Sequence, residues 1–179
     1  MKKQICLVIG ECHSDNIGDQ AIASGAVSLL TEAGYDAKTL DLNGRKSLDT
    51  PNMTHQDESP FLLGWRNRLA KRMKRSPMGY SIAGLLVTIL KGIRLARYYN
   101  LPIRSCDILI IGGGSLLINN NWNFPILLSF VTAIAKCYGK PILLLGVSAR
   151  EIENLIARSL VRIIVRNSKL VMVRDIHSL

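Results

Sequence analysis

Short and almost uninterrupted apolar runs, each followed by a stretch with helical spacing, constrain the fold of this chain more than any other feature. Four such runs are "QICLVIG" (4–10), "DILIIGGGS" (107–115), "KPILLLGVS" (140–148) and "KLVMVRD" (169–175), and "DAKTLDL" (36–42) alternates as a further strand should. Strands this apolar are typical of a parallel sheet that helices cover on both faces. We therefore predict an α/β fold class, with a Rossmann-like, doubly wound parallel sheet.

Helices are predicted between these strands, over 19–33, most of 61–100, 124–139 and 151–167. In the first helix, the apolar side chains expected to face the core are those of Ile22, Ala26, Leu29 and Leu30, and Gly34 ends the helix. The long 61–100 stretch is expected to break near Pro77. A chain of 179 residues supports one sizeable core. We therefore expect a single domain over 1–179, with a basic helical insertion at about 61–100.

The cysteines and histidines indicate neither disulfides nor a metal site. Four cysteines are scattered without CxxC spacing, and we expect buried, reduced thiols. None of the three histidines stands at ligand spacing from another ligand type, so no metal and no other cofactor is expected. The start, "MKKQICLVIG", lacks the apolar length of a signal peptide, and we expect a cytoplasmic protein.

The loop after the first strand, "ECHSDNIGDQAI" (11–22), gathers polar groups at the start of a helix. It lacks the G-K-[ST] of a phosphate loop and the closely spaced glycines of a dinucleotide loop. One interpretation is that Asn16 and Asp19 hydrogen-bond sugar hydroxyls, or that Asp19 takes a proton. The structural alternative is that Asp19 caps the helix.

A second loop, after the strand at 107, begins with Gly112, Gly113, Gly114 and Ser115. Three missing side chains allow a ligand to approach bare backbone amides, which suits an anionic group, and the alternative is a tight packing turn. If the strands at 4 and 107 are neighbours, the two loops flank one crevice at the carboxyl edge of the sheet.

In their order and spacing, "DNIGDQAI", "DILIIGGGSLL", "PILLLGVS" and "VMVRDIHS" resemble the amino-terminal half of the polysaccharide pyruvyl transferase family. The resemblance implies a GT-B-like protein, with two Rossmann-like domains facing each other across a cleft. It also implies transfer of a pyruvyl group from phosphoenolpyruvate to hydroxyls of a cell-surface polysaccharide or its lipid-linked precursor.

The resemblance assigns roles to individual residues. Asp19 is implied as the catalytic residue, and the implied substrate-binding residues are Asn16, Gly18, Gly112, Gly113, Gly114, Ser115 and Arg174. Arg174 and Asp175 match the "RD" motif of the family, so Arg174 either reaches an anion or forms a salt bridge within the motif. Asp15 departs from the family's usual glycine, and "SAREIEN" (148–154) replaces a glycine-rich turn. Much of the donor-binding set is expected on a second domain, so we expect this chain alone to be incomplete.

Positive charge is concentrated in one segment of a chain whose net charge is +10. Between Trp65 and Asn100 there are nine basic residues and no acid. This segment is either a solvated face, an interfacial helix that contacts an anionic membrane through 66–97, or a nucleic-acid surface. The 13 uncharged residues from Met78 to Leu90 are too few to span a bilayer. No nucleic-acid motif accompanies the charge, and no nucleic-acid partner is expected.

Three functional hypotheses remain open on the sequence. The first is a transferase domain with phosphoenolpyruvate as donor and a glycan, lipid-linked or not, as acceptor. The second is a non-catalytic Rossmann-like module that binds a glycan or a partner at the membrane surface. The third is half of a nucleotide-sugar glycosyltransferase, which the GT-B likeness also allows.

Overall fold

The computed structural model describes residues 3–13, 16–44, 77–112, 123–148, 152 and 154–174, without the side chains of 77–88, Lys91 and Asn123. The elements in chain order are β1 (Ile5–Gly10), α1 (Ile17–Glu32), β2 (Asp36–Asp41), α3 (Pro77–Ser105), β3 (Ile108–Gly112), α4 (Asn123–Cys137), β4 (Ile142–Val147), α5 (Leu155–Asn167) and β5 (Leu170–Val173).

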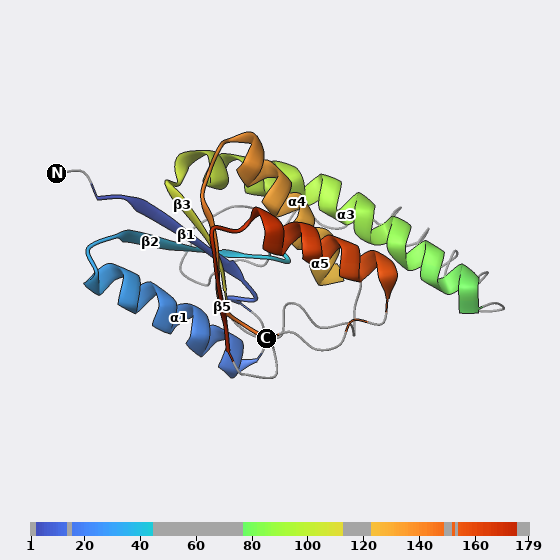
Figure 1. Cartoon of the computed structure of the whole chain (residues 1–179), viewed down its shortest axis with the longest axis horizontal. Helices are drawn as coiled ribbons and strands as arrows, with labels where there is room; N and C mark the ends of the chain where they lie inside the picture. Colours follow the sequence, from blue (N-terminus) through green and yellow to red (C-terminus); the bar gives the residue numbers. More distant parts are fainter. Residues whose placement is uncertain are drawn as a thin grey trace.

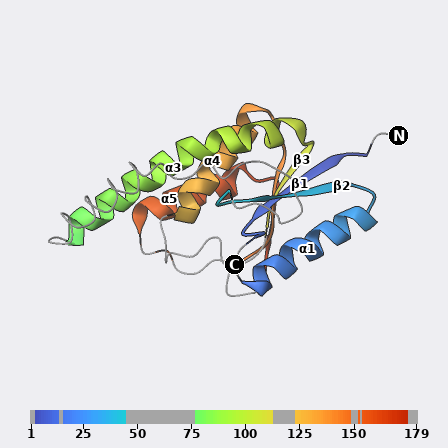
Figure 2. The ribbon, with the colours of Figure 1, turned by 180° about the vertical axis from the view of Figure 1, so that it is seen from behind.

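The five strands form one parallel sheet in the order β2-β1-β3-β4-β5. From β1 the chain adds β2 on one side, then crosses to the other side of β1 to add β3, and adds β4 and β5 in turn beyond β3. Helix α1 covers one face of the sheet, while α3, α4 and α5 cover the other (Figures 1 and 2). This arrangement confirms the predicted α/β class and the doubly wound parallel sheet. The change in direction puts a topological switch point between β1 and β3.

Alternate residues of the central strands bury their side chains in two cores, one on each face. Ile9, Ile111 and Leu144 belong to the larger core, beneath α3, α4 and α5. Val8 and Ile110 belong to the smaller core, beneath α1. Because strand side chains alternate between faces, runs that are apolar throughout supply both cores, as the sequence predicts.

Two helix starts differ from the prediction. Helix α1 begins at Ile17, two residues before the predicted start, and α5 begins at Leu155 rather than near 151. Each start follows an asparagine N-cap; the Asn154 Oδ1 accepts hydrogen bonds from the Ile156 and Ala157 amides at 2.9 and 3.2 Å. An asparagine cap satisfies amides that lack a helical partner, and so fixes where each helix begins.

The predicted apolar face of α1 was wrong at Leu29, whose side chain is 69% exposed. Ala23 is the buried residue of this helix, and Ala26, Val27 and Leu30 pack against the smaller core. The side of α1 that faces the sheet is therefore formed by Ala23, Ala26, Val27 and Leu30, and Leu29 lies outside it.

Helix α3 belongs to the stretch predicted as a basic insertion at about 61–100. It begins at Pro77, where the sequence predicts a break, and continues beyond residue 100 to Ser105. A Cβ atom at Gly92 would overlap with the ring of Phe130 on α4, so this glycine permits α3 and α4 to approach closely. Residues 61–76 of the predicted insertion lie outside the described residues, and the insertion as a domain feature stays a prediction.

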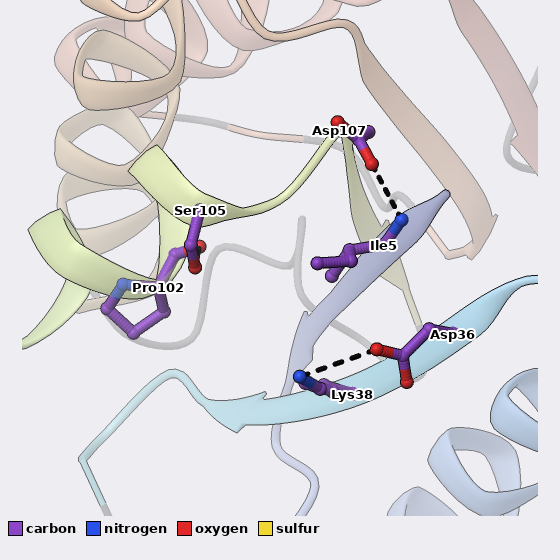
Figure 3. A network of polar contacts seen from close by, with 6 residues as sticks. All are labelled: Ile5, Asp36, Lys38, Pro102, Ser105 and Asp107. Atoms are coloured by element: carbon purple, nitrogen blue, oxygen red, sulfur yellow. Dashed lines mark hydrogen bonds and ion pairs between the residues drawn. The ribbon is translucent and has the colours of Figure 1, made fainter. Parts of the chain in front are cut away.

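The amino edge of the sheet carries its own polar contacts (Figure 3). The Asp107 Oδ2 accepts a hydrogen bond from the Ile5 amide at 2.8 Å, and Lys38 pairs with Asp36 at 3.4 Å. Both contacts are exposed, and they lie at the end of the sheet opposite its carboxyl edge.

Candidate functional site at the carboxyl edge

The neighbouring strands β1 and β3 bring the loops that follow them to one edge of the sheet. The strands pair in parallel from Cys6 opposite Ile108 to Ile9 opposite Ile111. This pairing meets the condition on which a shared crevice was predicted. In open α/β sheets ligands bind at such a switch point, outside the carboxyl ends of the strands.

Glycines permit the two strand ends to approach each other closely. A Cβ atom at Gly10 would overlap with the carbonyl oxygen of Gly112, and one at Gly112 would lie 3.1 Å from the carbonyl oxygen of Leu145. Close packing of the backbone therefore accounts for glycine at both positions. A binding role for Gly112 stays a prediction.

Asn16 and Asp19 form a hydrogen-bonded pair in the first turn of α1. The N-cap is Asn16, whose Oδ1 accepts a hydrogen bond from the Gly18 amide at 3.0 Å. The Asn16 Nδ2 donates to the Asp19 Oδ2 at 3.0 Å. The alternative in which Asp19 itself caps the helix was therefore wrong, because Asn16 takes that position and Asp19 lies three residues later. A carboxylate in the first turn is also favoured by the positive end of the helix dipole.

Gly18 leaves room for the asparagine cap. A Cβ atom at Gly18 would lie 3.2 Å from the Asn16 Oδ1, which is closer than ordinary van der Waals contact. The "NIGD" sequence thus has a local physical reason, in which asparagine caps the helix, glycine avoids crowding, and the Asp19 carboxylate is oriented by an amide.

Asp41, at the carboxyl end of β2, is a central polar group of this edge that we did not predict from the sequence. It is fully buried, and its carboxylate accepts hydrogen bonds from the His13 amide at 3.0 Å and from the Asn43 amide at 2.8 Å. Asp41 therefore attaches the loop after β1 to the turn after β2. The available signal was an aspartate at the end of a predicted strand, on the rim that also holds the first loop.

The charge of Asp41 acts on the groups around it. Burial, and secondly the Asp41 carboxylate, raise the pKa of the Cys12 thiol to about 11. The same two causes, in the same order, raise the pKa values of Tyr98 and Tyr99. The Tyr99 hydroxyl donates a hydrogen bond to the Leu42 carbonyl, so α3 is also attached to this edge. The Cys12 thiol and the two tyrosine hydroxyls therefore stay neutral at physiological pH, and they surround Asp41 on the interior side of this edge.

Arg174 lies at the same edge, immediately after β5, but not beside Asp19. Its amide donates to the Val147 carbonyl at 3.1 Å, and its side chain is exposed. Strand β5 is three positions from β1 in the sheet, which corresponds to about 14 Å at the usual strand spacing. Gly113, Gly114, Ser115 and Asp175 lie outside the described residues.

The described part of the chain holds both buried and exposed free thiols. Cys6, Cys12 and Cys106 are buried free thiols as predicted, whereas Cys137 is exposed. Within the described ranges there is no group of three or more His, Cys, Asp or Glu side chains that could hold a metal ion. No described helix is long and apolar enough to cross a membrane.

Comparison with known proteins identifies a family. The family model described as "Polysaccharide pyruvyl transferase" matches residues 16–179, which is most of the chain. No curated protein and no solved structure matches it.

Proposed function

Since this chain belongs to the polysaccharide pyruvyl transferase family, we propose that it takes part in pyruvyl transfer from phosphoenolpyruvate to hydroxyls of a cell-surface polysaccharide or its lipid-linked precursor. The observation that carries the proposal is the Asn16–Asp19 pair, joined at 3.0 Å beside the switch point of the sheet. We expect a cytoplasmic setting, in which lipid-linked precursors at the inner face of the membrane are within reach.

The proposed reaction requires a base and an anion-binding group. A sugar hydroxyl loses its proton, its oxygen bonds to C2 of phosphoenolpyruvate, and C3 takes up a proton to become a methyl group. A second hydroxyl of the sugar then bonds to C2, the bond from C2 to the phosphate oxygen breaks, and inorganic phosphate leaves with the proton that the second hydroxyl gives up. The product is a pyruvate ketal.

We assign the first proton transfer to Asp19. A positioned carboxylate serves as a general base only when it is held toward the hydroxyl, and the amide of Asn16 orients this one. The hydrogen bonds from His13 and Asn43 to Asp41 support the loop that leads into this turn. Asp41 is thus proposed as a positioning residue behind the acceptor site.

Donor binding is assigned to the glycine loop from Gly112 to Ser115 and to Arg174. Backbone amides and a guanidinium are suitable partners for phosphate and carboxylate oxygens. Arg174 follows β5, about three strand spacings from β1, so the groups assigned to the donor are spread along the edge of the sheet. We therefore propose that a second domain supplies further donor-binding groups opposite this edge.

The test is phosphate release from phosphoenolpyruvate with and without glycan acceptors, in the longest gene product that contains this sequence. Replacement of Asp19 by Ala is expected to lower acceptor-dependent release by about 10²-fold or more, the usual contribution of a general base. Glu32→Ala removes an exposed carboxylate from the other end of the same helix and is expected to leave release unchanged. Equal activity in the Asp19 and Glu32 variants would reject Asp19 as the base.

A different result would favour a binding module. If the folded protein binds glycan but releases no phosphate with any acceptor, the hypothesis of a non-catalytic binding module is favoured. Release that depends on a nucleotide sugar instead would favour a glycosyltransferase.

A further inference from the structure

The helices on one face of the sheet carry positive charge and no acidic residue. Helices α3, α4 and α5 together contain Lys91, Arg94, Arg97, Arg104, Lys136, Arg158, Arg162 and Arg166, and neither Asp nor Glu. The acidic residues that the structure describes all belong to other segments, namely Glu11, Asp19, Glu32, Asp36, Asp41 and Asp107. Among the described residues, the α3–α4–α5 layer therefore carries positive charge alone, and the acids lie on the other segments.

On α3, exposed arginines and leucines form one stripe along the helix. Intervals of four and three residues place them on the same side of the helix, opposite Tyr99 and Ile103, which are fully buried. Leu101 is 73% exposed and Leu90 55%. The stripe consists of Leu90, Arg94, Arg97, Leu101 and Arg104.

Helix α5 repeats this pattern. Its buried side is formed by Ala157 and Ile164, and the opposite side carries Leu155, Arg162 and Arg166, at intervals of seven and four residues. Leu155 is 74% exposed, and Ile163, beside the stripe, is 50% exposed. Helix α4 lies between α3 and α5 in this layer (Figures 1 and 2).

These arginines have no carboxylate partner in the part of the chain that the structure describes, where the salt bridge found is that of Lys38 with Asp36. A solvated protein surface normally mixes both signs of charge. Exposed leucines and isoleucines beside these arginines suit the surface of an anionic bilayer, which has a layer of charged headgroups above the apolar acyl chains. The cations contact lipid phosphates, and the apolar side chains enter the boundary of the acyl region.

We propose that the outer side of the α3–α4–α5 layer, bounded by the α3 and α5 stripes, docks on an anionic lipid bilayer. This extends the membrane contact expected of residues 66–97 to Arg104 and to α5, neither of which belongs to that segment. The inference deepens the membrane part of the proposed function and does not depend on pyruvyl transfer. A nucleic acid fits this surface less well, because the side chains between the cations are aliphatic rather than aromatic.

The test is flotation of the full chain with vesicles of phosphatidylcholine and phosphatidylglycerol in equal parts, and with vesicles of phosphatidylcholine alone. The α5 pair R162Q/R166Q and the α3 pair R97Q/R104Q each remove two positive charges from the stripes. K3Q/K38Q is the matched control, because it removes two exposed positive charges at β1 and β2. Circular dichroism and thermal unfolding show that each variant remains folded.

We expect binding to anionic vesicles at low salt that weakens at high salt. Each arginine near an anionic surface contributes about 1 kcal/mol, which is about fivefold in the partition coefficient. Each stripe pair should therefore lower this coefficient roughly 30-fold, and the control pair should change it little. Leu101→Asn should weaken binding without altering its salt dependence.

Four results would overturn the inference. Equal binding to neutral vesicles would remove the role of charge, and equal loss in the control pair would show an effect of net charge alone. Undiminished binding by the α5 pair would exclude α5 from any membrane contact and so reject docking through both stripes. Salt-sensitive binding to RNA without binding to vesicles would assign the layer to a nucleic acid. Phosphate release is measured separately, so its absence would not affect this result.

Discussion

Replacing Asp41 tests whether one buried carboxylate holds the carboxyl edge together. Its oxygens accept hydrogen bonds from the His13 and Asn43 amides at 3.0 and 2.8 Å, on a side chain with 0% exposure. A buried amide that loses its acceptor costs about 1–3 kcal/mol. Asp41→Ala removes both acceptors and should lower the free energy of unfolding by about 2–6 kcal/mol. Asp41→Asn keeps one acceptor oxygen and should lower it by about 1–3 kcal/mol.

The assay is urea unfolding, with the slope against urea checked for constancy. Because total stability is about 5–15 kcal/mol, the asparagine variant should remain folded while its midpoint falls measurably. For a chain of this size, each kcal/mol corresponds to roughly 2–4 °C in Tm. Amide hydrogen exchange at His13 and Asn43 provides the local readout, and it should accelerate in both variants.

Asp107→Asn is the matched control, since this carboxylate also accepts a backbone amide hydrogen bond, at 2.8 Å, but on the exposed amino edge. We expect it to change stability by no more than about 0.5 kcal/mol, as is usual for surface substitutions. If Asp41→Asn is no more destabilising than this control, and exchange at His13 is unchanged, the reasoning about Asp41 is refuted.

Three further predictions concern the interior. The Thr132 hydroxyl is buried without a hydrogen-bond partner among the described residues, so Thr132→Val should raise the free energy of unfolding by about 1 kcal/mol in urea, and a loss would contradict this. Gly92→Ala should destabilise by about 1–3 kcal/mol, because its Cβ overlaps with Phe130, and the double variant with Phe130→Ala should lose less than the sum of the single losses. Burial first, and then Asp41, raise the pKa of Cys12 from an ordinary 9.0 to about 11. The unfolded state therefore loses its proton first, and stability present below pH 9 should fall as pH rises to about 11, at up to about 1.4 kcal/mol per pH unit. Cys12→Ala should flatten this alkaline loss, and an unchanged pH profile would contradict it.

The order of elements and the fold class could be predicted from the sequence because they depend on local patterns. Continuous apolar runs mark strands buried on both faces, and each predicted strand is present in the sheet. The adjacency of β1 and β3 was stated from the sequence only as the condition for a shared crevice, and the two strands are neighbours in the sheet. The predicted ends were wrong by a few residues where an asparagine, Asn16 or Asn154, begins the helix.

The features that could not be predicted depend on contacts between distant segments. Asp41 was read as part of an alternating strand, and its role arises from a hydrogen bond to His13, 28 residues away in sequence. The arginine stripe of α5 could not be predicted from a sum of charge along the sequence, because acids elsewhere in the chain offset its charge. The six described acids all lie outside α3, α4 and α5, and this separation is visible only in three dimensions.

The most direct test of the candidate site is a nuclear magnetic resonance titration of the ¹⁵N-labelled chain with phosphoenolpyruvate and with glycan acceptor. If the carboxyl edge at the β1–β3 switch point is the substrate site, the amides of Gly10, Asn16, Asp19 and Gly112 should shift and saturate, while those of Ile5 and Asp107 at the amino edge stay fixed. This result does not require the chain to be active alone. Saturable shifts confined to the amino edge or to the α3–α4–α5 layer would contradict the site.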